Sequence, residues 1–338
     1  MKNTRPRVFS GIQPTSEMHF GNYFGAIKNW VELQEKYECI YSVVDYHAMT
    51  MPYIPGELQS NTMNMVIDLM ACGVDPEKCV LFIQSLVPEH TELTWILSCY
   101  TSYGELQRMT QFKDKSESEK VQEKGNIVST GLFTYPILQA ADILIYKAEY
   151  VPVGKDQEQH LELSRNIANR FNGRHEIYFK EPRVLLTEVP KLLSLADPAK
   201  KMSKSLGDQH VVRLFEPEAS IRKKVKSAVT DIGPKTDTMS PGVANLFELL
   251  KACGKMDEHK ALMEDYNAGL LKYSALKENV ANGLVDLSKQ FIDRKAALTE
   301  SNRDIEEQVH AMSDKARAIA KETIREVRDL VGLPVRRH

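Results

Sequence analysis

Short apolar runs alternate with helical patterns over the first 85 residues of the chain. Three runs have the length of buried strands and two stretches have the periodicity of helices: 8–10, 39–44 and 79–83, and 22–34 and 58–71, respectively. Strands that alternate with helices form a parallel sheet through right-handed crossovers. We therefore predict an α/β fold, with ligands bound beyond the carboxyl ends of the strands, where Ser10-Gly11 and Asp45-Tyr46-His47 would lie.

The same alternation resumes after a polar stretch in the middle of the chain. Residues 111–128 mix lysines with acidic residues and a glycine, which predicts a mobile loop. An extended segment at 150–153 then lies between helical patterns at 132–146 and 156–172. We expect these elements to extend the parallel sheet.

The last third of the chain has helical patterns only. Apolar residues recur at helical spacing in several series, the longest of which runs from Ile305 to Leu330. Pro217 suits the first turn of a helix, and Ser301 with Asp304 suits the start of another. We therefore predict a C-terminal all-helical region.

The composition narrows the class of protein. Of 338 residues, 42% are hydrophobic and 27% are charged, which is typical of a folded globular protein. No apolar run near the N-terminus has the length of a signal peptide or a membrane span, so we expect a cytoplasmic protein without a membrane partner. The five cysteines have no zinc-site spacing, so we expect no structural metal, with Cys39, Cys79 and Cys99 in the core.

Charge is distributed unevenly along the chain. The net charge of -2 argues against coating by nucleic acid through bulk electrostatics. Between residues 199 and 226, however, three acidic residues accompany a cluster of basic ones: Lys200, Lys201, Lys204, Arg213, Arg222, Lys223, Lys224 and Lys226. This local excess predicts an anionic ligand.

The first candidate for chemistry is the segment from Ser10 to Asn22, which reads as a strand, a turn and a helix start. His19 and Asn22 would lie where unpaired helical N–H groups favour a phosphate, and Gly21 would let a nucleotide approach the backbone. A string of this kind is weak when it stands alone. A helix-capping turn with a satisfied histidine is the alternative interpretation.

The second candidate is the loop Lys200-Lys201-Met202-Ser203-Lys204-Ser205. Lysine is a mobile point charge that follows a pyrophosphate as it leaves. A run of charges is commonly a solvated face, but here the lysines alternate with Met and Ser and precede a Gly207-Asp208 turn. The sequence has no G-x-x-x-x-G-K-[ST] string, which excludes an ordinary P-loop. The loop therefore predicts a binding site for the phosphates of ATP in an adenylating enzyme.

Together the two segments resemble the paired motifs of class I aminoacyl-tRNA synthetases. Further stretches are similar to the bacterial tryptophan-specific members over nearly the whole chain: 9–15, 45–48, 104–113, 135–142 and 151–157. The resemblance implies a Rossmann-type parallel sheet catalytic domain over residues 1–205, with the lysine loop at 201–205. It also implies a helical anticodon-binding region over 206–338, whose last helix either stays there or returns to the catalytic domain.

The resemblance further implies an activity. The protein would ligate L-tryptophan to tRNA(Trp) through a tryptophanyl-adenylate, with release of pyrophosphate and AMP. It would act as a homodimer and use ATP with Mg²⁺ carried by the nucleotide, without a metal site of its own.

Site residues follow from the resemblance position by position. The ATP contacts would be Gln13, Pro14, Thr15, Gly21, Asn22, Gly154, Lys155, Asp156, Gln157, Leu192, Lys201, Met202, Ser203, Lys204 and Ser205. The tryptophan contacts would be Phe9, His47, Gln111, Tyr135, Gln139 and Asp142. The catalytic group would be His19, Asn22, Lys115, Lys201, Ser203 and Lys204.

Asp142 lies among apolar neighbours in the sequence, where a carboxylate needs a hydrogen-bond donor. A substrate indole N–H would supply one, and a substrate without it would leave the carboxylate unpaired at a cost of roughly 1 to 3 kcal/mol. The alternative is a helix carboxylate bonded to neighbouring backbone or to a lysine.

Four positions depart from the family pattern. Gln139 replaces a usual Met, Lys155 a usual Glu and Tyr46 a usual Gln, and Ser16-Glu17 replaces a Gly-containing pair. Gln139 resembles the tyrosine-specific enzymes, whereas Phe9 cannot meet a tyrosine hydroxyl. A tyrosyl-tRNA synthetase, a small-molecule adenylyltransferase of the same superfamily and an RNA-binding module without catalysis stay open as alternatives.

Overall fold

A five-stranded parallel sheet forms the centre of the computed structural model, which describes residues 5–14, 17–112, 128–152, 154, 157–185, 192–230, 238–300 and 302–335. The strands are β1 (Arg7–Ile12), β2 (Glu38–Val43), β3 (Val80–Ile83), β4 (Tyr150–Val151) and β5 (Arg183–Val184). Their order in the sheet is β3-β2-β1-β4-β5. The direction of winding therefore reverses between β1 and β4, which is where ligands bind in Rossmann-type sheets. This arrangement confirms the predicted fold class.

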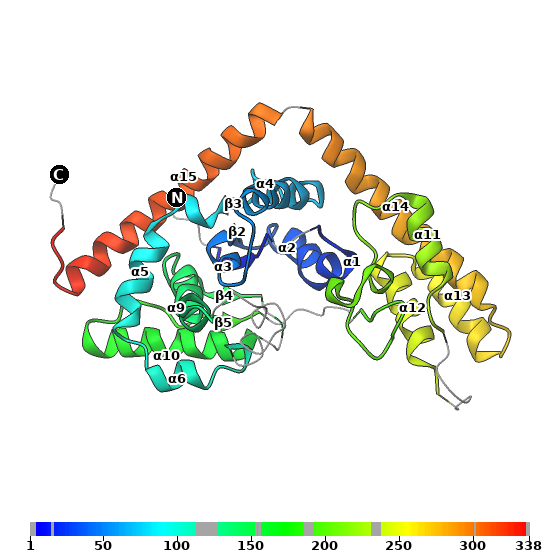
Figure 1. Cartoon of the computed structure of the whole chain (residues 1–338), viewed down its shortest axis with the longest axis horizontal. Coiled ribbons are helices and arrows are strands. Elements are labelled where there is room, and N and C mark those ends of the chain that lie inside the picture. Colours follow the sequence, from blue (N-terminus) through cyan, green and yellow to red (C-terminus); the bar gives the residue numbers. More distant parts are fainter. Residues whose placement is uncertain are drawn as a thin grey trace.

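Helices make every crossover in this sheet (Figure 1). They are α1 (Phe20–Asn22), a π-helical turn (Tyr23–Ile27), α2 (Lys28–Leu33), α3 (Asp45–Ala48), α4 (Pro55–Ala71), α5 (Glu89–Ser98), α6 (Tyr103–Gln107), α9 (Thr130–Leu144) and α10 (Glu158–Arg174). The pattern predicted α2, α4, α9 and α10 within a few residues. It missed α5 and α6, which are too short to show a clear helical period.

The two faces of the sheet enter two different cores, because side chains alternate along a strand. Phe9, Ile40 and Phe82 pack with α5, α9 and α10. Val8, Tyr41 and Leu81 face the opposite way and pack with α2 and α4. Burial on both faces explains why these strands read as continuous apolar runs.

Beyond residue 217 the described part of the chain contains helices and no strand. They are α11 (Glu218–Lys226), α12 (Pro241–Ala252), α13 (Met256–Asn267), α14 (Tyr273–Thr299) and α15 (Asn302–Leu330). The prediction of an all-helical C-terminal region is confirmed. In Figure 1, α14 and α15 form a long arch over the sheet, with α11, α12 and α13 beside α14.

Helix α15 spans both cores. Ile305, Val309 and Met312 join the core that contains α4 and α14, whereas Ala316, Ile324 and other residues of its second half join the core that contains α5 and α9. The hydroxyl of Thr323 donates to the carbonyl of Ile145 at 2.7 Å. The second half of α15 therefore packs on the part of the protein that contains β3, α5 and α9.

Two expectations fare differently. Cys99 is exposed, so the prediction that it lies in the core was wrong, while Cys39 and Cys79 are buried. Cys99 follows the last turn of α5 on the side away from the sheet core.

The predicted loop at 111–128 falls mostly outside the described residues. Among the helices that are described, none has the length and apolar character needed to cross a membrane.

Candidate active site

A cavity of about 510 Å³ opens between the carboxyl ends of β1 and β4. Eleven of the predicted site residues line it: Phe9, Gln13, Asn22, His47, Gln111, Tyr135, Gln139, Asp142, Gly154, Gln157 and Lys201. These side chains come from both halves of the sheet, on either side of the reversal in winding. The cavity is therefore the candidate active site.

Main-chain hydrogen bonds join the first predicted phosphate segment to the stretch that follows the lysine loop. The N–H of Phe20 donates to Val212 at 3.0 Å, and the N–H of Leu214 donates to Met18 at the same distance. On its other side the lysine loop is held by the N–H of Met202, which donates to Leu192 at 3.1 Å. The backbone thus fixes the lysine loop beside the start of α1.

Gly21 has a steric role in this arrangement. A Cβ at Gly21 would lie 2.8 Å from both Nδ1 and Cε1 of His19, and 3.5 Å from Cβ of Met202. No larger residue fits unless the imidazole shifts. The absence of a side chain therefore lets the lysine loop and His19 pack against the first turn of the helix.

His19 is a neutral group at physiological pH. Burial and the nearby charges of Lys204 and Lys201 lower the pKa of its imidazole to about 4. Its Nδ1 is buried and has no hydrogen-bond partner among the described residues. Asn22 is held close by, because its Oδ1 accepts the backbone N–H of His19 at 3.2 Å. A buried polar atom without a partner is costly, so a ligand that contacts Nδ1 would relieve a penalty.

Lys204 is half-buried and its ammonium is correspondingly destabilised. Burial lowers the pKa of Lys204 to about 8, although the carboxylates of Glu17 and Asp68 oppose the shift. The loop therefore presents a cation that titrates close to physiological pH. An anionic ligand would stabilise its charged form.

The remaining predicted ATP contacts are placed as follows. Pro14, Leu192 and Met202 are buried, and Ser203 is half-buried beside the cavity. Thr15, Lys115, Lys155 and Asp156 lie outside the described residues, as does the side chain of Ser205. Gln139, the departure from the family pattern, donates its amide N–H to Gln157 at 3.3 Å.

Aromatic side chains form the wall of the cavity near Phe9. The ring of Phe9 stacks on Tyr146 with centroids 5.6 Å apart and planes inclined by 16°. The hydroxyl of Tyr135 donates to Gln111 at 3.2 Å and lies 2.9 Å from Nε2 of His160. This end of the cavity is therefore an apolar slot, with polar groups whose positions are fixed by their neighbours.

The structure corrects the expectation for Asp142. Its carboxylate has three side-chain partners within the protein: His47 Nε2 at 2.7 Å, Gln84 Nε2 at 2.7 Å and His90 Nδ1 at 2.6 Å. A substrate without a donor would therefore not leave it unpaired. Burial alone raises the pKa of Asp142, but the hydrogen bonds from His47 and His90 outweigh it and keep the pKa below its ordinary value. Asp142 is thus a buried, ionised acceptor.

Sequence reasoning missed Gln84 and His90. Gln84 directly follows β3, so the rule that ligands gather at the carboxyl ends of strands would have found it when applied to this third strand. His90 lies in the first turn of α5, a helix that the pattern did not reveal. Both side chains are fully buried.

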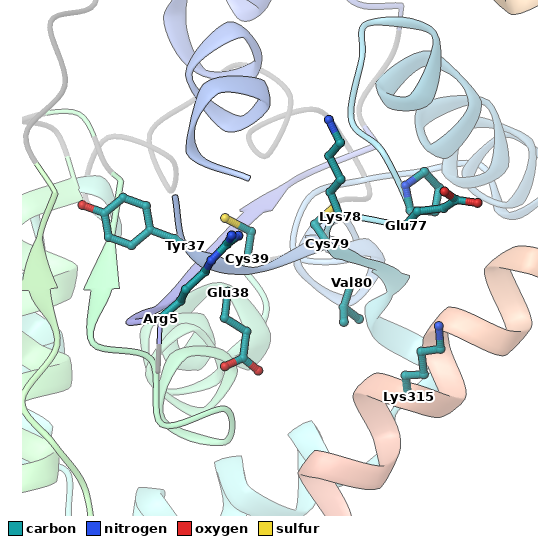
Figure 2. Close-up of a pocket in the computed structure, with 10 residues that line it drawn as sticks. Arg5, Tyr37, Glu38, Cys39, Glu77, Lys78, Cys79, Val80 and Lys315 are labelled. Carbon is teal, nitrogen blue, oxygen red and sulfur yellow. The ribbon is translucent and has the colours of Figure 1, made fainter. Parts of the chain in front are cut away.

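A second hollow, of about 240 Å³, lies at the opposite end of the strands (Figure 2). Its lining mixes basic residues with acidic ones and with two thiols from the starts of β2 and β3, Cys39 and Cys79. Burial raises the pKa of these thiols to about 11 and about 12. Because it lies at the amino ends of the strands and holds none of the predicted site residues, it is not the candidate active site.

Comparison with known proteins identifies the family. Residues 1–289 match the family described as tRNA synthetases class I (W and Y). The chain is 43% identical to Tryptophan--tRNA ligase 2 of Streptomyces avermitilis, with full coverage of both chains. It is 42% identical to Tryptophan--tRNA ligase of Clostridium tetani, with 98% of this chain and 97% of that protein covered.

Solved structures agree with these sequence matches. Tryptophanyl-tRNA synthetase of Campylobacter jejuni, complexed with ADP and tryptophan, superposes with a TM-score of 0.83 at 35% identity, covering 97% of this chain and 100% of that one. The enzyme of Mycoplasma pneumoniae superposes with a TM-score of 0.85 at 33% identity, covering 98% and 99%. This chain therefore belongs to the class I tRNA synthetases of the W and Y group.

Proposed function

We propose that this chain ligates L-tryptophan to tRNA(Trp) through a tryptophanyl-adenylate, with release of pyrophosphate and then AMP. One observation carries the proposal: a single cavity joins the aromatic slot beside Asp142 to the lysine loop at Lys201. A reaction between an aromatic amino acid and a nucleoside triphosphate needs one cavity that binds a substrate at each end. Full-length relatives at 41 to 43% identity that carry the name Tryptophan--tRNA ligase support it.

The amino acid would occupy the aromatic end. Phe9 and Tyr135 offer apolar surface to an indole, and Asp142 offers an acceptor to its N–H. Gln111, which is already bonded to Tyr135, would lie near the substrate amino group. These contacts fix the ring and leave the substrate carboxylate pointing toward the nucleotide.

ATP would occupy the other end, with its phosphates between the start of α1 and the lysine loop. Gln13, Asn22, Gly154 and Gln157 line this part of the cavity together with Lys201. Neutral His19 would orient the triphosphate by hydrogen bonding, since it carries no charge near pH 7. Mg²⁺ would arrive on the phosphate oxygens of ATP and neutralise part of their charge.

In the first step a carboxylate oxygen of tryptophan attacks the α-phosphorus in line, and the bond from that phosphorus to pyrophosphate breaks. Lys201, Ser203 and Lys204 would stabilise the charge that develops on pyrophosphate, together with Lys115. Catalysis is then mainly positioning and charge stabilisation, without a covalent enzyme intermediate. In the second step a terminal ribose hydroxyl of tRNA attacks the acyl carbon, and AMP leaves.

The division of labour along the chain is part of the proposal. Residues 1–205 would carry the catalytic domain and 206–338 the region that reads the anticodon, with the end of α15 packed back on the sheet. The enzyme would work as a cytoplasmic homodimer.

Tyrosine is the alternative substrate, and the cavity favours tryptophan. Phe9 presents a hydrocarbon ring where a tyrosine hydroxyl would need a partner, and the amide of Gln139 is engaged with Gln157. ATP-pyrophosphate exchange with each amino acid in turn tests the proposal. We expect exchange with tryptophan alone, reduced by orders of magnitude in Lys204→Ala with little change in tryptophan binding. Exchange with tyrosine instead, or undiminished exchange in Lys204→Ala, would contradict it.

A further inference from the structure

We infer that His90 and Gln84 are positioning residues for the substrate indole: they occupy Oδ1 of Asp142, so that Oδ2 accepts the hydrogen bond from the ligand. This inference rests on the proposed function, and it assigns the two buried side chains that the mechanism above does not use. It also identifies the carboxylate oxygen that accepts the hydrogen bond from the substrate.

The division between the two oxygens is seen in the hydrogen bonds. Oδ1 of Asp142 accepts from Gln84 Nε2 at 2.7 Å and from His90 Nδ1 at 2.6 Å. Oδ2 accepts from His47 Nε2 at 2.7 Å. A carboxylate has about four acceptor sites, two on each oxygen. Within the described part of the chain, these side-chain donors fill both sites on Oδ1 and leave one on Oδ2.

The free site faces the cavity. His47, the partner of Oδ2, lines the cavity together with Asp142, whereas Gln84 and His90 belong to neither its wall nor its mouth. Both lie behind the carboxylate and are fully buried. A ligand in the cavity therefore meets Oδ2.

The orientation of Gln84 is determined by a second contact. Its Oε1 accepts the backbone N–H of Tyr46 at 3.2 Å. The amide oxygen is thereby committed, so the NH₂ group must point to Asp142. This contact ties the carboxylate to the carboxyl ends of β2 and β3.

The tautomer of His90 is determined in the same way. An ionised carboxylate only accepts, so Nδ1 of His90 carries the proton. Nε2 lies 2.8 Å from the hydroxyl of Tyr146 and is hydrogen-bonded to it. Tyr146 in turn stacks on Phe9 in the wall of the cavity. The aromatic slot and its acceptor are therefore held by one connected set of side chains.

Two substitutions test the roles of the two ring nitrogens of His90 separately. The amide nitrogen of Asn is as many bonds from Cβ as Nδ1 of His, so His90→Asn keeps a donor toward Asp142. The amide nitrogen of Gln matches Nε2, so His90→Gln keeps a polar group toward Tyr146 and loses the donor. Gln84→Met removes the second donor with little change in volume.

The readout is the preference for tryptophan over β-(3-benzothienyl)alanine, which has sulfur in place of the indole N–H. We would measure kcat/KM for both amino acids in ATP-pyrophosphate exchange, with KM for ATP as the control for general damage. We expect His90→Gln and Gln84→Met to lower the preference about tenfold or more, because a hydrogen bond to a charged group is lost. His90→Asn should retain a preference within about threefold of the wild type.

Loss of activity toward both amino acids by the same factor, with the preference unchanged, would show a packing role and overturn the inference. Equal preferences in His90→Asn and His90→Gln would do the same. If the His90 variants do not fold, Gln84→Met decides alone, and an unchanged preference for tryptophan in that variant would overturn the inference. Absence of tryptophan-dependent exchange in the wild type would instead defeat the proposed function.

Discussion

Gly21 lies against the imidazole of His19 so closely that a Cβ at Gly21 would lie 2.8 Å from His19 Nδ1. The same Cβ would come within 3.5 Å of Met202, in the lysine loop. The missing side chain therefore leaves room for the imidazole of His19 at a place where Met202, about 180 residues further along the chain, also approaches Gly21.

Gly21→Ala should consequently displace the imidazole of His19, whereas Met202, 3.5 Å from the new Cβ, keeps an ordinary contact. We expect kcat/KM for ATP to fall about 100-fold or more, since small misplacements of reacting groups have effects of that order. KM for tryptophan should change little, because Asp142 and Phe9 lie at the other end of the cavity. Gly173→Ala is the matched control: a Cβ there meets nothing within 4 Å. It should leave exchange unchanged. Equal effects of the two substitutions would contradict the steric role of Gly21.

The titration of Lys204 predicts a basic limb in the pH profile. Its pKa of about 8 is lowered by burial, so the free enzyme loses this positive charge as the pH rises through about 8. Because kcat/KM reports the free enzyme, kcat/KM for ATP should decline above pH 8. In Lys204→Arg, kcat/KM for ATP should stay constant up to pH 10, since a guanidinium keeps its proton. A limb that persists at pH 8 in this variant would assign the titration to another group.

His19 predicts the absence of an acid limb in the same profile. Its pKa is lowered to about 4 by burial and by the lysine charges, so it is neutral from pH 5 upward. Near pH 6.5, kcat/KM for ATP should therefore show no inflection that depends on His19, so the profiles of the wild type and His19→Asn should have the same shape there. Such an inflection would mean that a charged imidazole takes part.

Asp142→Asn tests the buried acceptor. The amide would present an NH₂ group to His47, Gln84 or His90, all of which donate to the carboxylate in the native protein. We expect kcat/KM for tryptophan to fall by a factor that corresponds to roughly 2 to 4 kcal/mol of activation free energy, with KM for ATP nearly unchanged. Glu162→Gln, on the exposed face of α10, serves as a control for loss of one carboxylate. A drop shared equally by ATP and tryptophan would indicate general unfolding of the site.

The packing of α15 on the sheet predicts a stability effect. Ile324 is buried in the core that contains α5 and α9, and Lys321 in the same helix is exposed. Ile324→Ala should lower the free energy of unfolding of the protein by about 2 to 5 kcal/mol, and Lys321→Ala by less than about 0.5 kcal/mol. Urea unfolding followed by circular dichroism measures both. An unchanged midpoint for Ile324→Ala would mean that the end of α15 does not contribute to that core.

The sequence by itself determined the parallel sheet and the helical last third, and it located the two segments for which we propose phosphate binding. Continuous apolar strands alternate with amphipathic helices, and this periodicity is a local property of the chain. The lysines and glycines of the two segments are likewise visible at fixed spacing, and their order was sufficient for the family resemblance. Helix α5 was missed, because it is short and three of its apolar residues are consecutive, so that no clear helical period results.

Only the tertiary structure decided what surrounds Asp142. Its partners His47, Gln84 and His90 lie 95, 58 and 52 residues away along the chain. The apolar neighbours of Asp142 in the sequence suggested a carboxylate that needs a donor from the substrate, because local sequence carries no information about side chains that arrive from other helices. Hydrogen bonds between distant residues depend on the register of the sheet and the packing of α5 and α9. Folding therefore produces an acceptor with two side-chain donors on one oxygen and one on the other.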